Sequence, residues 1–380
     1  MKAKNLFNVM MASCLLACSI VNSYACTVLA ITDKNGNVYQ GRANEFPYQQ
    51  PDALTYWPAG TRIESATPDG KQGKTFNTKY GILSATLKGM LANTKQDTVH
   101  EGANDQGMSI TANFYTLNTE TTITVPASQT LSILDFPTWA LGNFQTVEQL
   151  KQAIKNKEVE VWLPRLPVYG NLITPVHYAI YDKSGGAVVV EWNDGKMNIY
   201  DNPVGVMTNE PPFPWHLTNM NNFAYLSNVD KNSGKFNKLN VTAVDSGGAL
   251  ASLPNPNTSI GRFVKAAYYS NFAEKASTPD QAFLTLSHVL NNFDRPKGIT
   301  IDNPNAASAA LGAKGSSSES TYFVVLKDLS RNLFMIRTIN AFNFTQFDLN
   351  KLKEVKETKV VSFKELNANS NLNGNQLLLK

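Results

Sequence analysis

The sequence has few cysteines, with only three in 380 residues, at positions 14, 18 and 26. Two of the three lie within the first 25 residues, so Cys26 is the only cysteine in the rest of the chain. A single cysteine cannot form an internal disulfide, which excludes a disulfide framework. A chain of this length buries a sizeable core without such cross-links. A lone thiol is therefore either buried and inert or present for its reactivity.

The sequence also lacks the residue patterns that are typical of metal sites, phosphate-binding sites and nucleic-acid-binding surfaces. The four histidines, His100, His177, His216 and His288, stand far apart, and none has a partner at metal-ligand spacing. We therefore expect no metal site. No glycine-rich phosphate-binding motif is present. Without Lys2 and Lys4, 32 basic residues balance 30 acidic ones, a near-neutral chain that predicts no binding to nucleic acid or to a charged membrane surface.

The first 25 residues have the three parts of a secretory signal. Lys2 and Lys4 form a basic start, residues 6–21 are mostly apolar, and Ser23 and Ala25 are small residues at the positions that a signal peptidase recognises. The apolar stretch is short for a membrane span, which needs roughly 20 apolar residues, and no later stretch is long enough. We expect residues 1–25 to be removed and residues 26–380 to form a single exported domain, periplasmic or extracellular, that begins with Cys26.

Residues 15–18, Leu-Leu-Ala-Cys, allow a second interpretation. They resemble a lipoprotein processing box, which would attach lipid to Cys18 and leave Cys26 inside the chain. The protein would then be a non-catalytic lipoprotein or binding module anchored through Cys18. The identity of the N-terminal residue distinguishes the two interpretations.

Strand-like and helix-like segments occur in separate runs. Residues 27–32 and 38–41 are rich in β-formers and flank Asn35-Gly36, which predicts a hairpin. Further strands are expected at 81–87, 108–115, 177–181, 187–192 and 196–200, with a final hairpin at 322–326 and 333–339. Helices are expected at 131–141, from Thr146, at 261–276 and, after Thr278 as cap, at 282–290. Such runs favour α+β layers over alternating βαβ units.

Cysteine at the start of a chain can do chemistry without a histidine. Its α-amine has a pKa near 8, so a sizeable fraction is neutral at neutral pH and can act as a general base for the thiol. A nearby guanidinium would favour the thiolate by charge attraction. Arg42 is the candidate, because the predicted hairpin returns it beside Cys26. As a residue type alone, Arg42 could equally be a solvated arginine at a strand end.

Five stretches together resemble the choloylglycine hydrolase family in order and spacing. These are Cys26-Thr27, GRANEF at 41–46, NDQGMS at 104–109, MTNEPPF at 207–213 and SIGRFVKAAYY at 259–269. The family contains penicillin V acylases, bile salt hydrolases and acyl-homoserine-lactone acylases, all N-terminal nucleophile hydrolases. The resemblance spans nearly all of the chain after residue 25. It implies an α+β fold in the form of a four-layer αββα sandwich of antiparallel sheets.

The resemblance also implies roles for individual residues. Cys26 is similar to the family's nucleophile, Arg42 to the cation beside it and Arg262 to the arginine that orders the other polar groups of the site. Asn209 is similar to the side-chain oxyanion donor, although it could also be a turn residue before the proline pair that follows. Glu45 stands where the family has an aspartate that contacts the α-amine, and its extra methylene changes its reach.

A backbone N–H should supply the second oxyanion donor. Alignment on Asn104 and Gly107 without gaps selects Phe114, while Asn113 is one step away and matches the asparagine of some relatives. A shift of one residue reverses the face of a strand, so only one of the two can point into the site. We expect Phe114.

The implied reaction is hydrolysis of an amide in a small N-acyl compound through a thioester on Cys26, without a cofactor. Phe46, Phe114 and Tyr115 would place aromatic surface near the acyl group. Penicillin V and acyl-homoserine lactones are ranked ahead of conjugated bile salts, because the exported relatives resemble this chain more. The resemblance further implies a homotetramer, although no interface can be identified from these residues.

Overall fold

The structure is a computed structural model, and it describes residues 25–50, 52–88, 94–301, 319–368 and 374–379. Most of the expected signal segment, including Cys18, lies outside the described residues. In the described part of the chain, no helix has the length and apolar character that crossing a membrane requires.

The first strand of the described chain, which begins at Cys26, belongs to a six-stranded antiparallel sheet. Its strand order is β16 (Val206–Met207), β1 (Cys26–Thr32), β2 (Val38–Phe46), β19 (Ser320–Asp328), β20 (Leu333–Thr338) and β21 (Thr345–Asp348). The expected hairpin joins β1 to β2. Asp33 closes its turn, because Asp33 Oδ1 accepts hydrogen bonds from the backbone N–H groups of Asn35 and Asn37, and Gly36 takes the required positive φ of 83°.

A second antiparallel sheet packs on the first. Its order is β15 (Lys196–Asp201), β14 (Ala187–Asn193), β13 (Val176–Asp182), β8 (Met108–Phe114), β7 (Thr98–Asn104), β6 (Ile82–Leu87), β3 (Asp52–Trp57) and β22 (Lys359–Ser362). The strands expected from the sequence occur here with bounds shifted by no more than one residue.

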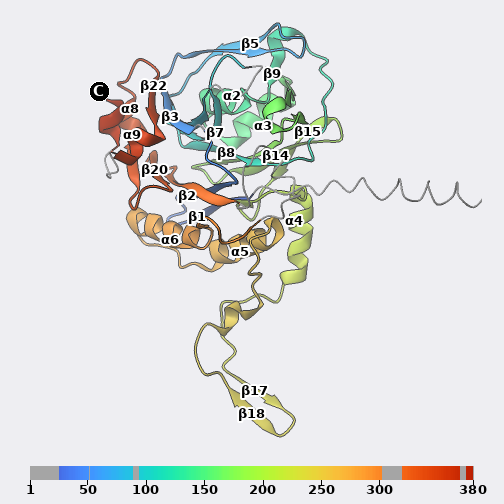
Figure 1. Ribbon diagram of the computed structural model, residues 1–380, viewed down its shortest axis with the longest axis vertical. Coiled ribbons are helices and arrows are strands. Elements are labelled where there is room, and N and C mark those ends of the chain that lie inside the picture. The colour runs from blue at the N-terminus through green and yellow to red at the C-terminus, as the bar shows by residue number, and fades with distance from the viewer. Residues whose placement is uncertain (1–24, 51, 89–93, 302–318, 369–373, 380) are drawn as a thin grey trace, which may run out of the picture.

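Helices cover the outer faces of both sheets (Figure 1). Helices α5 (Ser259–Phe272) and α6 (Pro279–Asn291) lie on β1 and β2, while α2 (Phe136–Asn143) and α3 (Val147–Lys155) lie on the larger sheet. Gly41 lets α6 approach β2 closely, because a Cβ there would collide with Leu290. The four layers confirm the expected αββα sandwich.

The remaining elements are short. The helices are α4 (Phe213–Asn219), α8 (Leu349–Leu352), α9 (Phe363–Ala368) and α10 (Asn375–Leu378), with 3₁₀ turns at Ala127–Gln129, Pro167–Tyr169, Met220–Phe223 and Gly248–Ser252. Small two-stranded sheets pair β4 (Arg62–Ala66) with β5 (Gln72–Asn77), β9 (Thr130–Ser132) with β10 (Glu160–Trp162), β11 (Arg165–Leu166) with β12 (Leu172–Ile173), and β17 (Ser233–Phe236) with β18 (Leu239–Thr242). The helix expected from residue 131 begins only at Phe136, because residues 130–132 pair as a strand.

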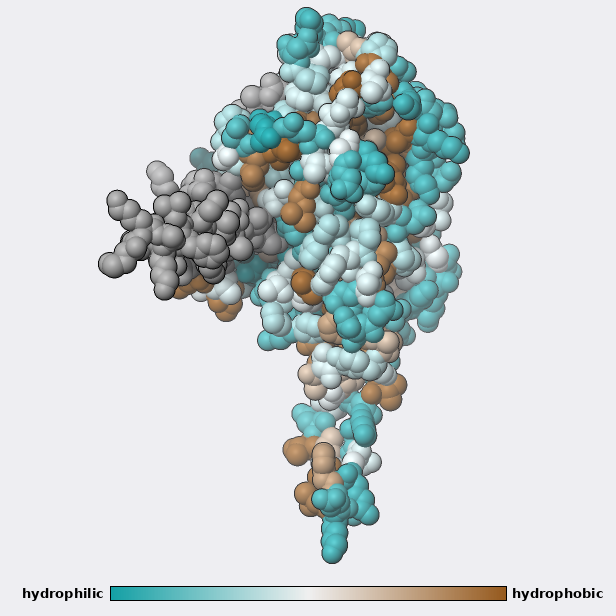
Figure 2. Space-filling model, turned by 90° about the vertical axis from the view of Figure 1, so that its right-hand side faces the viewer, coloured by the Kyte–Doolittle hydropathy of each residue, from teal (hydrophilic) through white to brown (hydrophobic). Residues whose placement is uncertain are grey.

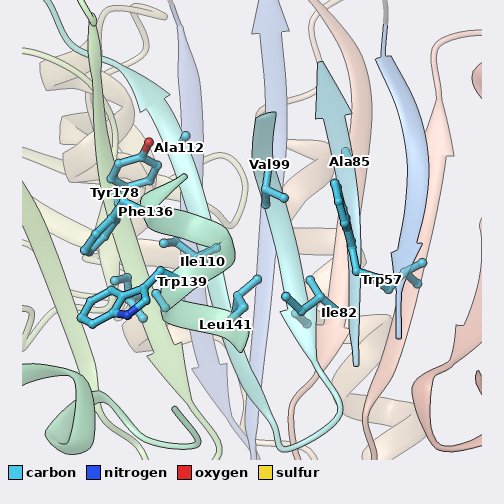
Figure 3. Close-up of a cluster of buried hydrophobic side chains, with 14 of the residues drawn as sticks. Trp57, Ile82, Ala85, Val99, Ile110, Ala112, Phe136, Trp139, Leu141 and Tyr178 are labelled. Atoms are coloured by element: carbon cyan, nitrogen blue, oxygen red, sulfur yellow. The ribbon is translucent and has the colours of Figure 1, made fainter. Parts of the chain in front are cut away.

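The larger hydrophobic core includes the contact between α2 and the eight-stranded sheet. Phe136, Trp139 and Leu141 of α2 lie over Ile110 of β8 and its neighbours (Figure 3). By contrast, β17 and β18 form an arm that projects from the body (Figure 2), and Phe236 and Leu239 on it are 71% and 63% exposed.

Candidate active site

Cys26 is the first residue of β1 and is buried, with 3% of its surface exposed. Its partner on β2 is Asn44, and Arg42 is two residues away on the same strand. Because side chains alternate along a strand, Cys26, Arg42 and Asn44 share the face toward the larger sheet. Thr27 and Glu45 point to the opposite face, which α5 covers. The nucleophile candidate thus lies between the two sheets, at the end of its strand.

Arg42 is buried beside the thiol. Its Nη2 lies 3.5 Å from Cys26 Sγ and also donates to the carbonyl of Ala112 on β8. Its Nη1 donates to the carbonyl of His100 at 3.1 Å and faces Glu101 Oε2 at 3.4 Å. With 2% exposure, Arg42 is not a solvated strand-end arginine. Its geometry suits stabilisation of a thiolate.

Asn209 and Arg262 hold the backbone of Cys26. The N–H of Cys26 donates to Asn209 Oδ1 at 3.0 Å, and Arg262 Nη2 donates to the same oxygen at 2.7 Å. Arg262 Nη1 also donates to the carbonyl of Cys26 and, at 2.9 Å, to Thr27 Oγ1. Asn209 is fully buried, and its Nδ2 donates to the carbonyl of Phe114 at 2.8 Å. Although Asn209 lies just before a cis peptide bond between Glu210 and Pro211, it is more than a turn residue, because its side chain faces Cys26.

Glu45 is fully buried on the α5 side of β2, and neither of its carboxylate oxygens makes a hydrogen bond within the described residues. Its nearest recorded charge is Arg262 Nη1, 4.0 Å from Oε2. Burial raises the pKa of Glu45 to about 8, against the lowering effect of Arg262. The structure contains Cys26 with Ala25 still attached, so the nitrogen is an amide, and no contact between it and the Glu45 carboxylate is recorded.

The register of β8 distinguishes Phe114 from Asn113. The N–H of Tyr115 donates to the carbonyl of Pro175, so Tyr115 and Asn113 direct their backbone groups toward β13. Phe114 directs its backbone groups away from β13, and its carbonyl accepts a hydrogen bond from Asn209 Nδ2. Of the two residues, Phe114 is therefore the one whose backbone faces Asn209.

Asn113 contributes through its side chain. Its Nδ2 donates to the carbonyl of Thr208 at 2.7 Å and to that of Cys26 at 3.4 Å. Asn113 therefore ties β8 to the start of β1 and to the segment that carries Asn209.

A small cavity adjoins Cys26. The space within it open to a water-sized molecule is about 60 Å³, and its lining includes Phe46, Phe114 and Tyr169. The three rings pack edge to face, with centroids 5.8 to 6.4 Å apart. A larger hollow of about 580 Å³ lies toward the other end of β1, lined in part by Tyr268 of α5. Of these two hollows, only the smaller has Cys26 in its lining.

Tyr115 does not line this cavity, contrary to the expectation from the sequence. It is fully buried, stacks on His177 with centroids 4.7 Å apart and donates to Asn193 Oδ1 at 2.9 Å. The physical reason is the alternation of side chains, which places Tyr115 and Phe114 on opposite faces. Tyr169, which the sequence analysis did not select, occupies the third aromatic position.

Sequence analysis also missed the polar groups behind Arg42. His100 Nδ1 lies 3.4 Å from Arg42 Nη1, and His100 Nε2 lies 2.9 Å from Asp52 Oδ1. Glu101 forms a second buried ion pair, with Lys327 of β19. Charged residues inside apolar strands are a signal of buried pairs, but the sequence does not say which residues pair.

His216 supports Asn209 from the other side. Its Nε2 faces the carbonyl of Asn209 at 3.0 Å, and its ring stacks on Phe263 of α5. Burial lowers the pKa of His216 to about 4, so the ring is neutral at neutral pH and donates one hydrogen bond without adding charge.

Within the described ranges, no group of three or more histidine, cysteine, aspartate or glutamate side chains is arranged to hold a metal ion. The chemistry available at this site is that of a thiol, two guanidinium groups, an amide side chain and a strand N–H.

Comparison with known proteins places this arrangement in a family. Residues 26–359 match the linear amide C–N hydrolases of the choloylglycine hydrolase family. A bile salt hydrolase/transferase of Clostridium perfringens is 26% identical over 351 residues, 90% of this chain and 100% of that protein. A penicillin V acylase of Pectobacterium atrosepticum is 24% identical over 342 residues, 85% of this chain and 83% of that protein.

Solved structures share the fold. A mutant of the conjugated bile acid hydrolase from Clostridium perfringens aligns with a TM-score of 0.74 and 23% identity, over 90% of this chain and 97% of that chain. Penicillin V acylase from Agrobacterium tumefaciens aligns with a TM-score of 0.68 and 22% identity, over 88% of this chain and 90% of that chain. The chain belongs to the choloylglycine hydrolase family and is an enzyme that hydrolyses the carbon–nitrogen bond of linear amides.

Proposed function

We propose that Cys26, once residues 1–25 have been removed, is the nucleophile of an exported N-acyl amidase. The observation that carries the proposal is the convergence of Arg42, Asn209 and Arg262 on one residue. Arg42 contacts the thiol at 3.5 Å, and Asn209 contacts the nitrogen at 3.0 Å. Arg262 contacts both Asn209 and the carbonyl of Cys26.

Cleavage would convert the nitrogen of Cys26 from an amide into an amine. The neutral amine has a lone pair that can take the thiol proton and later deliver it to the leaving amine. Asn209 Oδ1, which Arg262 fixes, would orient the amine by accepting one of its N–H groups. Arg42 would stabilise the thiolate that attacks the substrate carbonyl. Water then hydrolyses the thioester and releases the acid.

The tetrahedral intermediate needs donors for its oxyanion. Asn209 Nδ2 has two N–H groups, of which the Phe114 carbonyl takes one. We propose that the other N–H and the backbone N–H of Phe114 form the donor pair. Preorganised donors of this kind act in a buried site, where each is typically worth about 10²–10³ in rate.

The cavity favours a slender acyl group. Ligand pockets usually measure about 300–1,000 Å³, so a space of about 60 Å³ must widen for any substrate. A phenoxyacetyl ring or a fatty acyl chain demands less displacement of Phe46, Phe114 and Tyr169 than a fused steroid. We therefore propose penicillin V or an acyl-homoserine lactone as the substrate. A conjugated bile salt is the alternative, because bile salt hydrolases are among the relatives.

A substrate panel tests the proposal. We expect kcat/KM for penicillin V or an acyl-homoserine lactone to exceed that for glycocholate at least tenfold, and Cys26→Ala to abolish all three activities. A preference for glycocholate would overturn the choice of substrate. Equal turnover by the parent chain and Cys26→Ala would overturn the nucleophile. Phe236→Ser, in the exposed arm, serves as the matched control and should behave like the parent.

A further inference from the structure

Lys327 is a fully buried lysine that the proposed mechanism does not use. It lies on β19 between Leu326 and Asp328, and its ammonium group is 5.8 Å from the centroid of the Phe334 ring. Its ammonium group forms an ion pair with Glu101 Oε1 and donates to the carbonyl of Gly102 at 3.0 Å. Burial lowers its pKa, and the Glu101 carboxylate opposes that effect. Removing such a pair from water costs several kcal/mol per ion, so packing alone gives no reason for this residue.

Glu101 is shared between two cations. Its Oε1 pairs with Lys327, while its Oε2 lies 3.4 Å from Arg42 Nη1 and accepts from Thr111 Oγ1 at 2.9 Å. Glu101 is also the only carboxylate with a recorded ion pair to Arg42 in the described part of the chain. Asp52 lies beyond the His100 ring and reaches Arg42 only through it.

Lys327, Glu101 and Arg42 form a buried row in which Glu101 contacts both cations, and all three side chains are at most 2% exposed. Asp52 is the next buried carboxylate, and the His100 ring separates it from Arg42. Arg42 is the member of the row that reaches the thiol, since its Nη2 is 3.5 Å from Sγ. A thiolate at Cys26 would be attracted to Arg42, and a Glu101 carboxylate without Lys327 would weaken that attraction. Charge interactions are strong in such a buried site because the effective dielectric constant is low.

We propose that Lys327 is a positioning residue for the thiolate of Cys26. By neutralising Glu101, it leaves the charge of Arg42 to act on the sulfur. Without Lys327, the charge of Glu101 would act on Arg42 alone, and Arg42 would stabilise the thiolate less strongly. The inference rests on the proposed role of Cys26, but it concerns the ionisation of the thiol and does not require turnover.

The experiment measures the rate of Cys26 alkylation by iodoacetamide from pH 5 to 10, by mass spectrometry of the peptide that contains Cys26. Only the thiolate reacts, so the midpoint of the profile reports the pKa of the thiol. Lys327→Met keeps the length of the side chain and removes its charge. We expect about a tenfold slower reaction below the midpoint. Lys235→Met, on the exposed arm, is the control and should match the parent.

Charge balance provides the decisive comparison. Combining Lys327→Met with Glu101→Gln removes one charge of each sign, and we expect the alkylation profile to return to within about twofold of the parent. Glu101→Gln alone should make Cys26 react faster at low pH. Equal profiles for the parent, Lys327→Met and Glu101→Gln would overturn the proposal. If Lys327→Met does not fold, the absence of faster reaction in Glu101→Gln overturns it.

Amide turnover separates this inference from the proposed function. If the profiles shift as expected while none of the variants, nor the parent chain, hydrolyses any amide of the panel, the proposed function fails and the role of Lys327 stands.

Discussion

Glu45→Gln should make the stability of the protein less sensitive to pH. Glu45 is fully buried, its carboxylate makes no hydrogen bond to any residue that the structure describes, and burial raises its pKa from 4.5 to about 8. The folded state therefore holds this proton more strongly than the unfolded chain. The resulting stabilisation is fully present below pH 4.5 and is lost as the pH rises through 8. Glutamine has nearly the same shape and does not titrate, so the variant lacks this loss.

The magnitude follows from the same pKa. Each pKa unit corresponds to about 1.4 kcal/mol, so a group whose pKa rises from 4.5 to about 8 loses roughly 5 kcal/mol of folding stability across that range. At pH 7 the loss is about 3 kcal/mol. All other titrating groups are common to the two chains and cancel in the difference between them.

Urea unfolding of the parent and of Glu45→Gln at pH 5, 7 and 8.5 provides the assay, in a chain that keeps a residue before Cys26. We expect similar stability at pH 5 and an advantage for Glu45→Gln that grows steadily toward pH 8.5. Glu148→Gln, an exposed site on α3, is the control and should show no such trend. A difference that stays flat with pH would refute the reasoning. A smaller trend after cleavage would show that the new α-ammonium keeps Glu45 charged.

Three further substitutions test the site and its supports. Asn209→Ala removes one oxyanion donor and should lower kcat about 10²–10³-fold, and steady-state kinetics with an unchanged kcat would remove Asn209 from the mechanism. Asp52→Asn weakens the hold on the His100 ring, which lies between Asp52 Oδ1 and Arg42 Nη1. We expect a lower kcat with little change in KM, and parent-like kinetics would show that His100 only packs. Gly41→Ala should destabilise the fold by about 1–3 kcal/mol through overpacking against α6, and an unchanged urea midpoint would contradict the close approach of α6 to β2.

Local patterns carried most of the fold prediction. Alternating β-formers and turn residues located the strands, and Asn35-Gly36 located the hairpin that brings Arg42 back to Cys26. The predicted start of α2, at residue 131, was wrong, because residues 130–132 pair with a strand about thirty residues later in the chain. Such a pairing depends on tertiary contacts that a local pattern does not contain.

The sequence predicted the site residues that lie in family motifs, but it did not predict the residues that reach the site only through packing. Cys26, Arg42, Asn209 and Arg262 lie together as the resemblance implies, although their roles stay a prediction. Tyr115 was misplaced because Phe114 and Tyr115 are adjacent aromatic residues on opposite faces of the chain, and only the Phe114 face meets the cavity.

The buried polar groups behind Arg42 were missed for a different reason. Asp52 and His100 lie on separate strands of the larger sheet, and Lys327 of the smaller sheet meets Glu101 only because the two sheets stack. Burying a charged side chain costs free energy unless a partner offsets it, so the residue types indicate that partners exist. The sequence does not show which residues these partners are.

The central claim, that Cys26 reacts as the first residue of the chain, is tested most directly by mass spectrometry of the enzyme quenched in acid during turnover. The account predicts a chain that begins at Cys26 and carries one substrate acyl group on its thiol. A chain that retains Ala25 and still turns over the amide, a lipid-modified Cys18 terminus, or an acyl group on another residue would contradict it.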